Sequence, residues 1–234
     1  MDEPVTPALT ADAVARRANL AGIPALYRGL RLTDWNPYNN HAHAARSSVE
    51  AFLDTFEARV SSEAQNASRS LLGRGLALIG PPGMGKTTLA CITATEAAVR
   101  HNAGIMFVAV ADYMKALAKQ HAIKAQADRG VQEAIDLWWA IERMVHKAET
   151  TPLLVFDDVG KEHRTVSNAA IDEVDRLLRM RFRRALPTIA TTNLRLAAWG
   201  ESYNPSMASF AHETFDEVLL GGADLRKEAA RARR

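Results

Sequence analysis

Short apolar runs alternate with longer amphipathic segments along most of the chain. The apolar runs cover residues 76–79, 105–110, 153–156, 188–191 and 218–220. Within these runs the hydrophobic residues are continuous rather than alternating, which is typical of strands buried on both faces of a parallel sheet. The pattern therefore predicts an α/β fold, a three-layer sandwich in which helices cover both faces of a five-stranded parallel sheet.

The segment before the first apolar run has a different pattern. A short helical pattern covers residues 11–20, and a second one covers 47–60, followed by polar residues up to Ser70. The first is too short to bury a core of its own. We expect residues 1–22 to be a tail or docking helix, 23–72 an N-terminal extension that flanks the ligand site, and 73–234 the core.

Composition and charge narrow the class of protein. The 234 residues are 47% hydrophobic and 24% charged, which suits one sizeable globular domain. No apolar run approaches the ~20 residues that span a bilayer, so we expect a cytoplasmic protein without membrane contact. The single cysteine, Cys91, forms no internal disulfide, no Cys/His cluster has zinc spacing, and a net charge of +2 does not by itself indicate a nucleic-acid partner.

A glycine-rich sequence follows the first predicted strand directly and precedes a helical run over residues 88–100. Glycines let the backbone N–H groups point at phosphates, and the helix N-terminus adds partial positive charge. Lys86 supplies a cation for the β and γ oxygens, which also gives it a catalytic role. The predicted nucleotide-binding residues are Gly80, Pro81, Pro82, Gly83, Met84, Gly85, Lys86, Thr87 and Thr88.

Two carboxylates end the third predicted strand, at Asp157 and Asp158. Ligands of open α/β sheets bind at the carboxyl ends of the strands. We expect Thr87 and Asp157 to hold Mg²⁺, and Asp158, on the opposite face of the strand end, to orient or deprotonate the attacking water. The alternative is a strand-ending turn, which Asp and Gly favour in any protein.

A third polar element is Asn193, which follows the predicted strand 188–191. An amide can hydrogen-bond both a γ-phosphate and a lytic water, whereas a carboxylate would repel the phosphate. Asn193 is therefore a candidate catalytic residue, with a turn-closing Asn as the alternative.

The glycine-rich loop, the aspartate pair and Asn193, in this order along the chain, resemble the AAA+ ATPases. The resemblance is closer to their DnaC/IstB branch of replicative helicase loaders and transposition helpers. The similarity spans about residues 23–226. It leaves open whether the gene is chromosomal or phage-borne. It rests on the segments 153–160 (LLVFDDVG), 181–194 (RFRRALPTIATTNL) and 222–226 (GADLR), and on 23–27 and 32–37 before the loop.

The resemblance implies an ATPase that binds ATP or ADP with Mg²⁺. It also implies that the segment with Ile23 and Tyr27 borders the adenine. Spacing alone supports only an apolar segment that packs on the core.

Two features depart from the family. No arginine lies between Arg195 and Arg226, where such proteins carry the finger that completes a neighbour's site, and a missing finger costs about 10³ to 10⁵ in rate. Arg181, Arg183 and Arg184 are substitutes, or else they form the solvated face of a helix over 167–186. The chain after Asn193 is also too short for a strand and a full C-terminal lid domain.

The segment 112–150 mixes lysines and arginines with Trp138 and Trp139, which suits single-stranded DNA binding by backbone contact and base stacking. The alternative is a buried helix face formed by Val131, Ile135, Trp138, Ile141 and Val145. The basic tail 226–234 binds phosphates or remains solvated.

The leading hypothesis is a helicase loader for DNA replication that binds single-stranded DNA and a replicative DNA helicase, with self-association as a further expectation. An IstB-like transposition helper is the nearest alternative. A nucleotide-switched adaptor with little hydrolysis is another, and a small-molecule P-loop kinase lacks residues for a second substrate site.

Overall fold

The computed structural model describes residues 10–60, 69–160, 168–222 and 224–225. Five parallel strands form one sheet in the order β2-β3-β4-β1-β5. The strands are β1 (Gly75–Ile79), β2 (Ile105–Ala109), β3 (Leu153–Val159), β4 (Thr188–Thr192) and β5 (Phe215–Leu219). The predicted α/β class and the five-stranded parallel sheet are confirmed.

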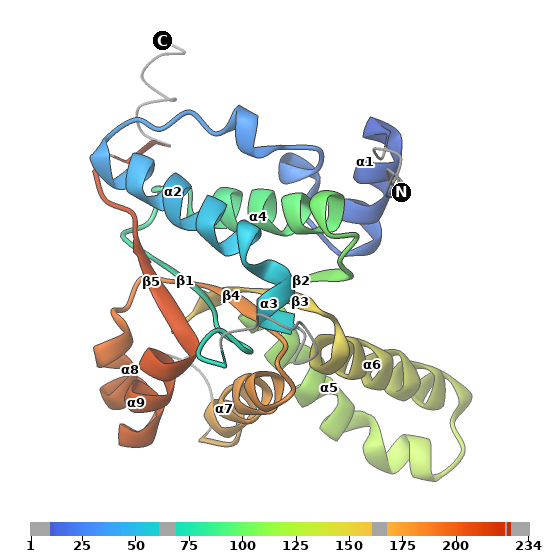
Figure 1. Ribbon diagram of the computed structural model, residues 1–234. Coiled ribbons are helices and arrows are strands. Elements are labelled where there is room, and N and C mark those ends of the chain that lie inside the picture. The colour runs from blue at the N-terminus through green and yellow to red at the C-terminus, as the bar shows by residue number, and fades with distance from the viewer. Residues whose placement is uncertain (1–9, 61–68, 161–167, 223, 226–234) are drawn as a thin grey trace.

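Helices cover the sheet on both sides (Figure 1). One face carries α1 (Ala11–Leu20), α2 (Asn40–Asp54), α3 (Phe56–Val60) and α4 (Lys86–Arg100). The other carries α5 (Val110–Asp128), α6 (Gln132–Thr150), α7 (Asn168–Arg183), α8 (Trp199–Ser202) and α9 (Pro205–Thr214). Among the described helices, none combines the length and apolar character that a membrane crossing requires.

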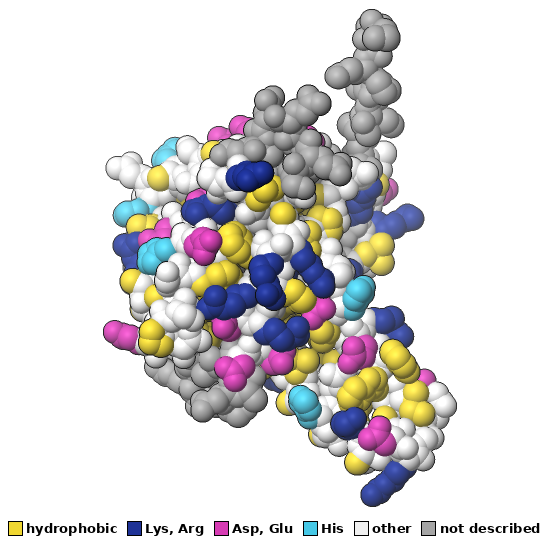
Figure 2. Space-filling model, turned by 60° about the horizontal axis from the view of Figure 1, so that its bottom comes forward, with side chains coloured by type: hydrophobic (Ala, Val, Ile, Leu, Met, Phe, Trp, Pro, Cys, Tyr) yellow, Lys and Arg dark blue, Asp and Glu magenta, His cyan; other side chains and the backbone are white. Residues whose placement is uncertain are grey.

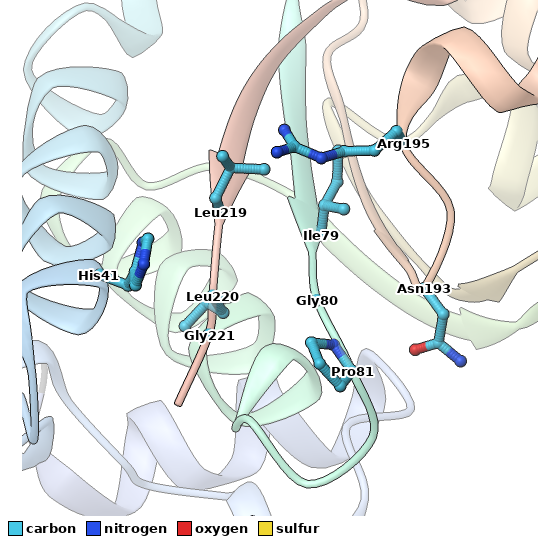
Figure 3. A pocket seen from close by; sticks show the side chains of 9 residues that line it. All are labelled: His41, Ile79, Gly80, Pro81, Asn193, Arg195, Leu219, Leu220 and Gly221. Carbon is cyan, nitrogen blue, oxygen red and sulfur yellow. The ribbon is translucent and has the colours of Figure 1, made fainter. Parts of the chain in front are cut away.

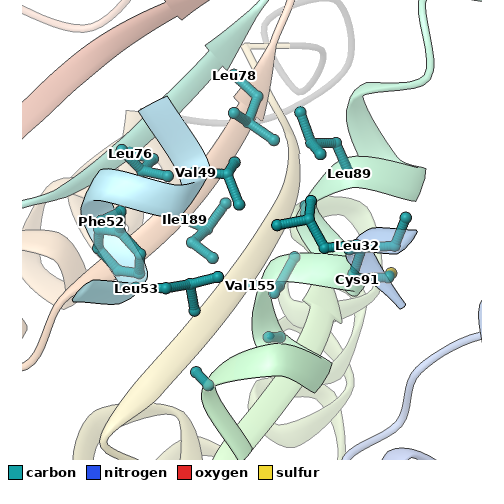
Figure 4. Packing of buried hydrophobic residues seen from close by; sticks show 14 of the residues in the cluster. Leu32, Val49, Phe52, Leu53, Leu76, Leu78, Leu89, Cys91, Val155 and Ile189 are labelled. Atoms are coloured by element: carbon teal, nitrogen blue, oxygen red, sulfur yellow. The ribbon is translucent and has the colours of Figure 1, made fainter. Parts of the chain in front are cut away.

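Side chains of the buried strands point alternately into two hydrophobic clusters. On β1, Leu76 and Leu78 belong to the cluster under α2 and α4, whereas Ala77 and Ile79 belong to the cluster on the opposite face. Figure 4 shows the first cluster, where Val49, Phe52 and Leu53 of α2 meet residues of the sheet and of α4. Each such buried side chain contributes about 1.5–3 kcal/mol, so the N-terminal extension is part of the packed core.

The predicted helix over 47–60 is two helices, and the first begins earlier. Asn39 caps α2, since its side chain accepts a hydrogen bond from the Ala42 backbone N–H. Thr55 ends α2, and α3 then starts at Phe56. The small and polar residues of the first two turns hide this start from a search for apolar periodicity.

Two strands differ from the predicted runs by more than one residue at one end. β3 continues through both aspartates to Val159, with a register irregularity against β4 between Phe156 and Val159. β5 begins at Phe215 rather than 218, because this edge strand starts with the half-exposed Asp216 and the exposed Glu217, whose polarity interrupts the apolar run.

Arg181 has a structural position in α7. It is fully buried, and its guanidinium donates to the carbonyls of Ala148, Thr151 and Pro187 and to the Thr188 hydroxyl. Burial lowers the pKa of Arg181 to about 9. The expectation that Arg181 is an arginine finger or part of a solvated face is therefore wrong, whereas Arg183 and Arg184 are exposed.

α5 and α6 form a hairpin that extends away from the sheet (Figure 1). The buried-face alternative for α6 is confirmed for Ile141 alone: Ile135, Trp138 and Val145 are half-buried, and Val131 is 46% exposed. The helix instead buries Ala134 and Ala148 along with Ile141. Trp139 is 57% exposed.

Candidate nucleotide-binding site

The glycine-rich loop connects the buried strand β1 to the N-terminus of α4. Gly83 and Gly85 have positive φ angles of 84° and 77°, which other residues rarely adopt. A Cβ atom at Gly80 would overlap the Leu220 carbonyl oxygen, and one at Gly83 would overlap the Asp224 carboxylate. The loop therefore needs glycine for both its conformation and its contacts, which is the requirement of a phosphate-cradling loop.

Lys86 connects the loop to the end of a neighbouring strand. Its ammonium group donates to the carbonyls of Gly80 (2.7 Å) and Pro81 (2.8 Å) and to the Asn193 side-chain oxygen (2.9 Å). The Lys86 residue is only 7% exposed. The structure thus brings together Lys86 and Asn193, two residues that the sequence predicted for the same γ-phosphate.

Asp157 and Thr87 also meet at this edge of the sheet. The Thr87 hydroxyl donates to Oδ1 of Asp157 at 2.9 Å, and the Thr191 hydroxyl donates to the same oxygen at 2.6 Å. Asp157 is buried. A hydroxyl beside a carboxylate is an oxygen donor set that suits Mg²⁺, so both residues fit the predicted metal role.

Asp158 lies in the irregular part of β3. Its φ of 65° is unusual for a residue other than glycine, and its backbone N–H donates to the Thr191 hydroxyl at 2.9 Å. Bulges of this kind re-aim side chains near active sites. The argument from regular strand alternation does not hold here, and the role of Asp158 as base stays a prediction.

A pocket of about 460 Å³ opens beside the loop, at the carboxyl ends of β1 and β5 (Figure 3). Asn193 reaches it from the end of β4, and Gly80 and Pro81 form its wall toward the loop. The further lining residues are His41, Ile79, Arg195, Leu219, Leu220 and Gly221.

Two aromatic residues of the N-terminal extension contact the loop. The Tyr38 hydroxyl donates to the Met84 carbonyl at 3.1 Å, and the Trp35 ring lies so close to Gly85 that a Cβ there would stand 3.0 Å from it. Ile23 is fully buried in the core under α4, and Tyr27 packs on the same cluster. The adenine contact of Ile23 and Tyr27 stays a prediction, whereas Trp35 and Tyr38 of the same extension do touch the loop.

The segment after β5 returns to the loop from the other end of the sequence. The Leu225 N–H donates to the Gly83 carbonyl at 3.2 Å, and the Asn39 amide donates to the Gly221 carbonyl at 2.7 Å. The extension and this segment therefore hold the phosphate loop, and each other, through direct contacts.

Glu96 of α4 anchors the extension. Its carboxylate accepts hydrogen bonds from Arg31, from the Leu32 backbone N–H and from Arg100. Burial alone would raise the pKa of Glu96, but these donors outweigh it and lower the pKa to about 2. The segment that leads to Trp35 and Tyr38 is thereby fixed on α4.

Sequence reasoning did not single out Thr191, Trp35 or Tyr38 as site residues. Thr191 lies two positions before Asn193 in a strand of the central sheet, so its place beside Asp157 follows from the order of the strands. No local pattern marks Trp35 or Tyr38, because they meet the loop through long-range packing.

Solved structures with the same fold include replication proteins. The DnaC helicase loader has a TM-score of 0.63 at 20% identity, covering 85% of this chain and 100% of that one. DnaI has a TM-score of 0.59 at 18% identity, covering 82% and 90%. AMPPCP-bound DnaA from Aquifex aeolicus has a TM-score of 0.57 at 14% identity, covering 90% and 55%. These likenesses establish the AAA+ fold.

Comparison with protein families assigns the chain more specifically than the fold does. A search of curated protein sequences found no significant relative. The model of the family "IstB-like ATP binding protein" matches residues 72–219, which is more than half of the chain and includes the phosphate loop, Asp157 and Asn193. The chain belongs to this family of IstB-like ATP binding proteins, and it is an ATP-binding AAA+ protein of the DnaC/IstB type.

Proposed function

We propose that the protein hydrolyses ATP with Mg²⁺ at the site between the phosphate loop and the ends of β3 and β4. The observation that carries this proposal is the pair of contacts Lys86–Asn193 and Thr87–Asp157, which join the loop to both strand ends. These contacts bring an amide and a carboxylate next to the phosphate loop.

Each residue has a role that its chemistry supports. The loop N–H groups and Lys86 bind the phosphates, and Thr87 and Asp157 would hold Mg²⁺, which neutralises charge on the β- and γ-phosphates when bound. Asn193 orients the attacking water and Asp158 accepts its proton. The water oxygen bonds to the γ-phosphorus while the bond from that phosphorus to the β–γ bridging oxygen breaks, giving ADP and inorganic phosphate.

We propose further that this activity serves a cytoplasmic loader that delivers a replicative helicase to single-stranded DNA. The α5–α6 hairpin supports the DNA part, since Trp139 is exposed and Lys115, Lys119 and Lys124 lie along α5. The Lys124 ammonium also lies 5.5 Å from the centre of the Trp138 ring, which keeps a cation next to the aromatic pair.

The test measures ATP turnover of the purified chain alone, with single-stranded DNA, with a replicative helicase, and with both. The loader proposal expects the highest rate with both. Stimulation by a transposase instead would favour the transposition helper, and no turnover in any combination would leave only a nucleotide-switched adaptor.

A pull-down from lysate of the source cells, with ATP present, identifies the partner. Recovery of the replicative helicase is the expected result, and its Lys86→Ala counterpart should recover less. Recovery of a transposase with no helicase would contradict the loader proposal.

A further inference from the structure

Arg195 lines the pocket beside the phosphate loop, two residues after Asn193. The pocket also contacts Gly80 and Pro81, whose carbonyls hold Lys86, so Arg195 shares one cavity with the phosphate-binding machinery (Figure 3). Its backbone is extended, with φ of −64° and ψ of 149°. Arg195 and Asn193 therefore reach the same cavity from a single short segment.

The Arg195 side chain is 59% exposed, and it pairs with Oε2 of Glu217 on β5 at 3.2 Å. The other oxygen of Glu217 accepts the Leu196 backbone N–H at 3.1 Å, which fixes the carboxylate in place. An exposed pair of this kind contributes little stability, so an anion in the pocket can compete for the guanidinium.

The charge of the pocket suits a phosphate. Among the described residues that line it, none is acidic, and Arg195 is the one permanent cation. A guanidinium binds two phosphate oxygens through N–H groups held in one rigid plane, a fixed geometry that an ammonium lacks. Figure 3 shows the Arg195 side chain directed toward Leu219, with Pro81 and Asn193 on the other side of the pocket, so the guanidinium would have to cross the pocket to reach a phosphate held there.

We propose that Arg195 is a catalytic residue that contacts the γ-phosphate of ATP bound to its own chain, with Glu217 as its resting partner. This inference rests on the proposed ATP hydrolysis. An arginine supplied by the same chain performs this role in some P-loop enzymes. It would account for a chain that has no arginine between Arg195 and Arg226, because Arg195 itself stabilises the charge that develops on the γ-phosphate.

Calorimetry with ADP and with a non-hydrolysable ATP analogue tests the contact without requiring turnover. Arg195→Ala should weaken analogue binding about tenfold, which is about 1.4 kcal/mol, and leave ADP binding unchanged, because only the analogue offers the γ-phosphate to this charge-assisted contact. The analogue affinity of Arg195→Lys should fall between that of Arg195→Ala and that of the unaltered chain. Arg176→Ala, which removes an exposed arginine of α7 that pairs with Glu149 and Glu173 outside the pocket, is the matched control and should change neither affinity.

Turnover measurements then distinguish an Arg195 that acts on ATP bound to its own chain from one that acts on ATP bound to a neighbouring chain. Arg195→Ala should lower kcat by about 10³. Mixing it with Lys86→Ala chains, which keep Arg195, should restore nothing, and restored turnover would overturn the proposal by placing Arg195 in a neighbour's site.

Two further results would also overturn the inference. Equal loss of ADP and analogue affinity in Arg195→Ala would show that the residue only joins β4 to β5. Unchanged analogue affinity would show that the guanidinium does not reach the γ-phosphate. If the unaltered chain bound neither nucleotide, the proposed function itself would fail, and the ADP measurement distinguishes that result.

Discussion

The phosphate loop and the α5–α6 hairpin are built in opposite ways. The loop is held by segments from both ends of the sequence, through Tyr38 and Leu225, and the ammonium of Lys86 ties it from within. The outer part of the hairpin packs mainly on itself: Ile123, Ala134 and Ile141 are buried there, and Gln120 donates to Glu142. Figure 2 shows the hairpin extending from the body of the molecule, with hydrophobic and charged side chains on its surface.

The difference separates two requirements of the proposed function. Phosphate chemistry needs groups fixed within fractions of an ångström, and the many contacts at the loop provide that. A surface for a flexible polymer needs exposed aromatic and basic groups more than it needs fixed geometry. Changes at the loop should therefore alter chemistry, and changes at the hairpin should alter partner affinity alone.

Arg181→Met should have the largest effect, and because it lowers the stability of the whole fold it should impair both the loop and the hairpin. Arg181 ties the end of α6 to α7 and β4, and its loss leaves four buried acceptors without their donor. We expect the free energy of unfolding to fall by about 3–5 kcal/mol, measured by urea denaturation. A loss below 1 kcal/mol would show that this buried guanidinium is not a structural element.

Asp157→Asn should affect the loop region alone. The Asn oxygen can still accept from Thr87 and Thr191, so the fold is retained, but the negative charge that Mg²⁺ needs is lost. We expect turnover to fall about 100-fold or more, with a melting temperature within a few degrees. Turnover that is unchanged at saturating Mg²⁺ would contradict the metal role.

Glu96→Gln tests whether the extension is fixed on α4. It should cost about 2 kcal/mol, because the hydrogen bonds from Arg31 and Arg100 lose their charged acceptor. The pKa of Glu96 is about 2 in the folded chain against an ordinary 4.5, so its stabilisation is complete above pH 4.5 and is lost as the pH falls toward 2. Denaturation at several pH values should show a shallower acid loss in the variant, and parallel curves would contradict this assignment.

Trp139→Ala should have the smallest effect on the fold and should act on the hairpin alone. Single-stranded DNA affinity should fall by about 1–3 kcal/mol, measured by fluorescence anisotropy with a labelled oligonucleotide. Stability and ATP affinity should stay unchanged, since the side chain is largely exposed. Leu137→Ala is the matched control on the same helix, and an equal loss of DNA binding there would argue against base stacking by Trp139.

The sequence predicted the loop region better than the hairpin. The five strands, the loop, Lys86, Asp157 and Asn193 follow from patterns that are local or that parallel topology brings together. The bulge at Asp158, the contacts of Trp35 and Tyr38, and the burial of Arg181 depend on segments distant in sequence. In α6 the small residues Ala134 and Ala148 are buried. Apolar periodicity instead selected larger residues of the same helix for the buried face.

Calorimetric titration of the unaltered chain and of Lys86→Ala with ATP and ADP tests the central claim most directly. We expect the unaltered chain to bind both nucleotides, and Lys86→Ala to lose at least tenfold in affinity, about 1.5–3 kcal/mol, while it unfolds at a similar temperature. No nucleotide binding by the unaltered chain, or equal affinity in the folded variant, would contradict the assignment of the loop as the phosphate site.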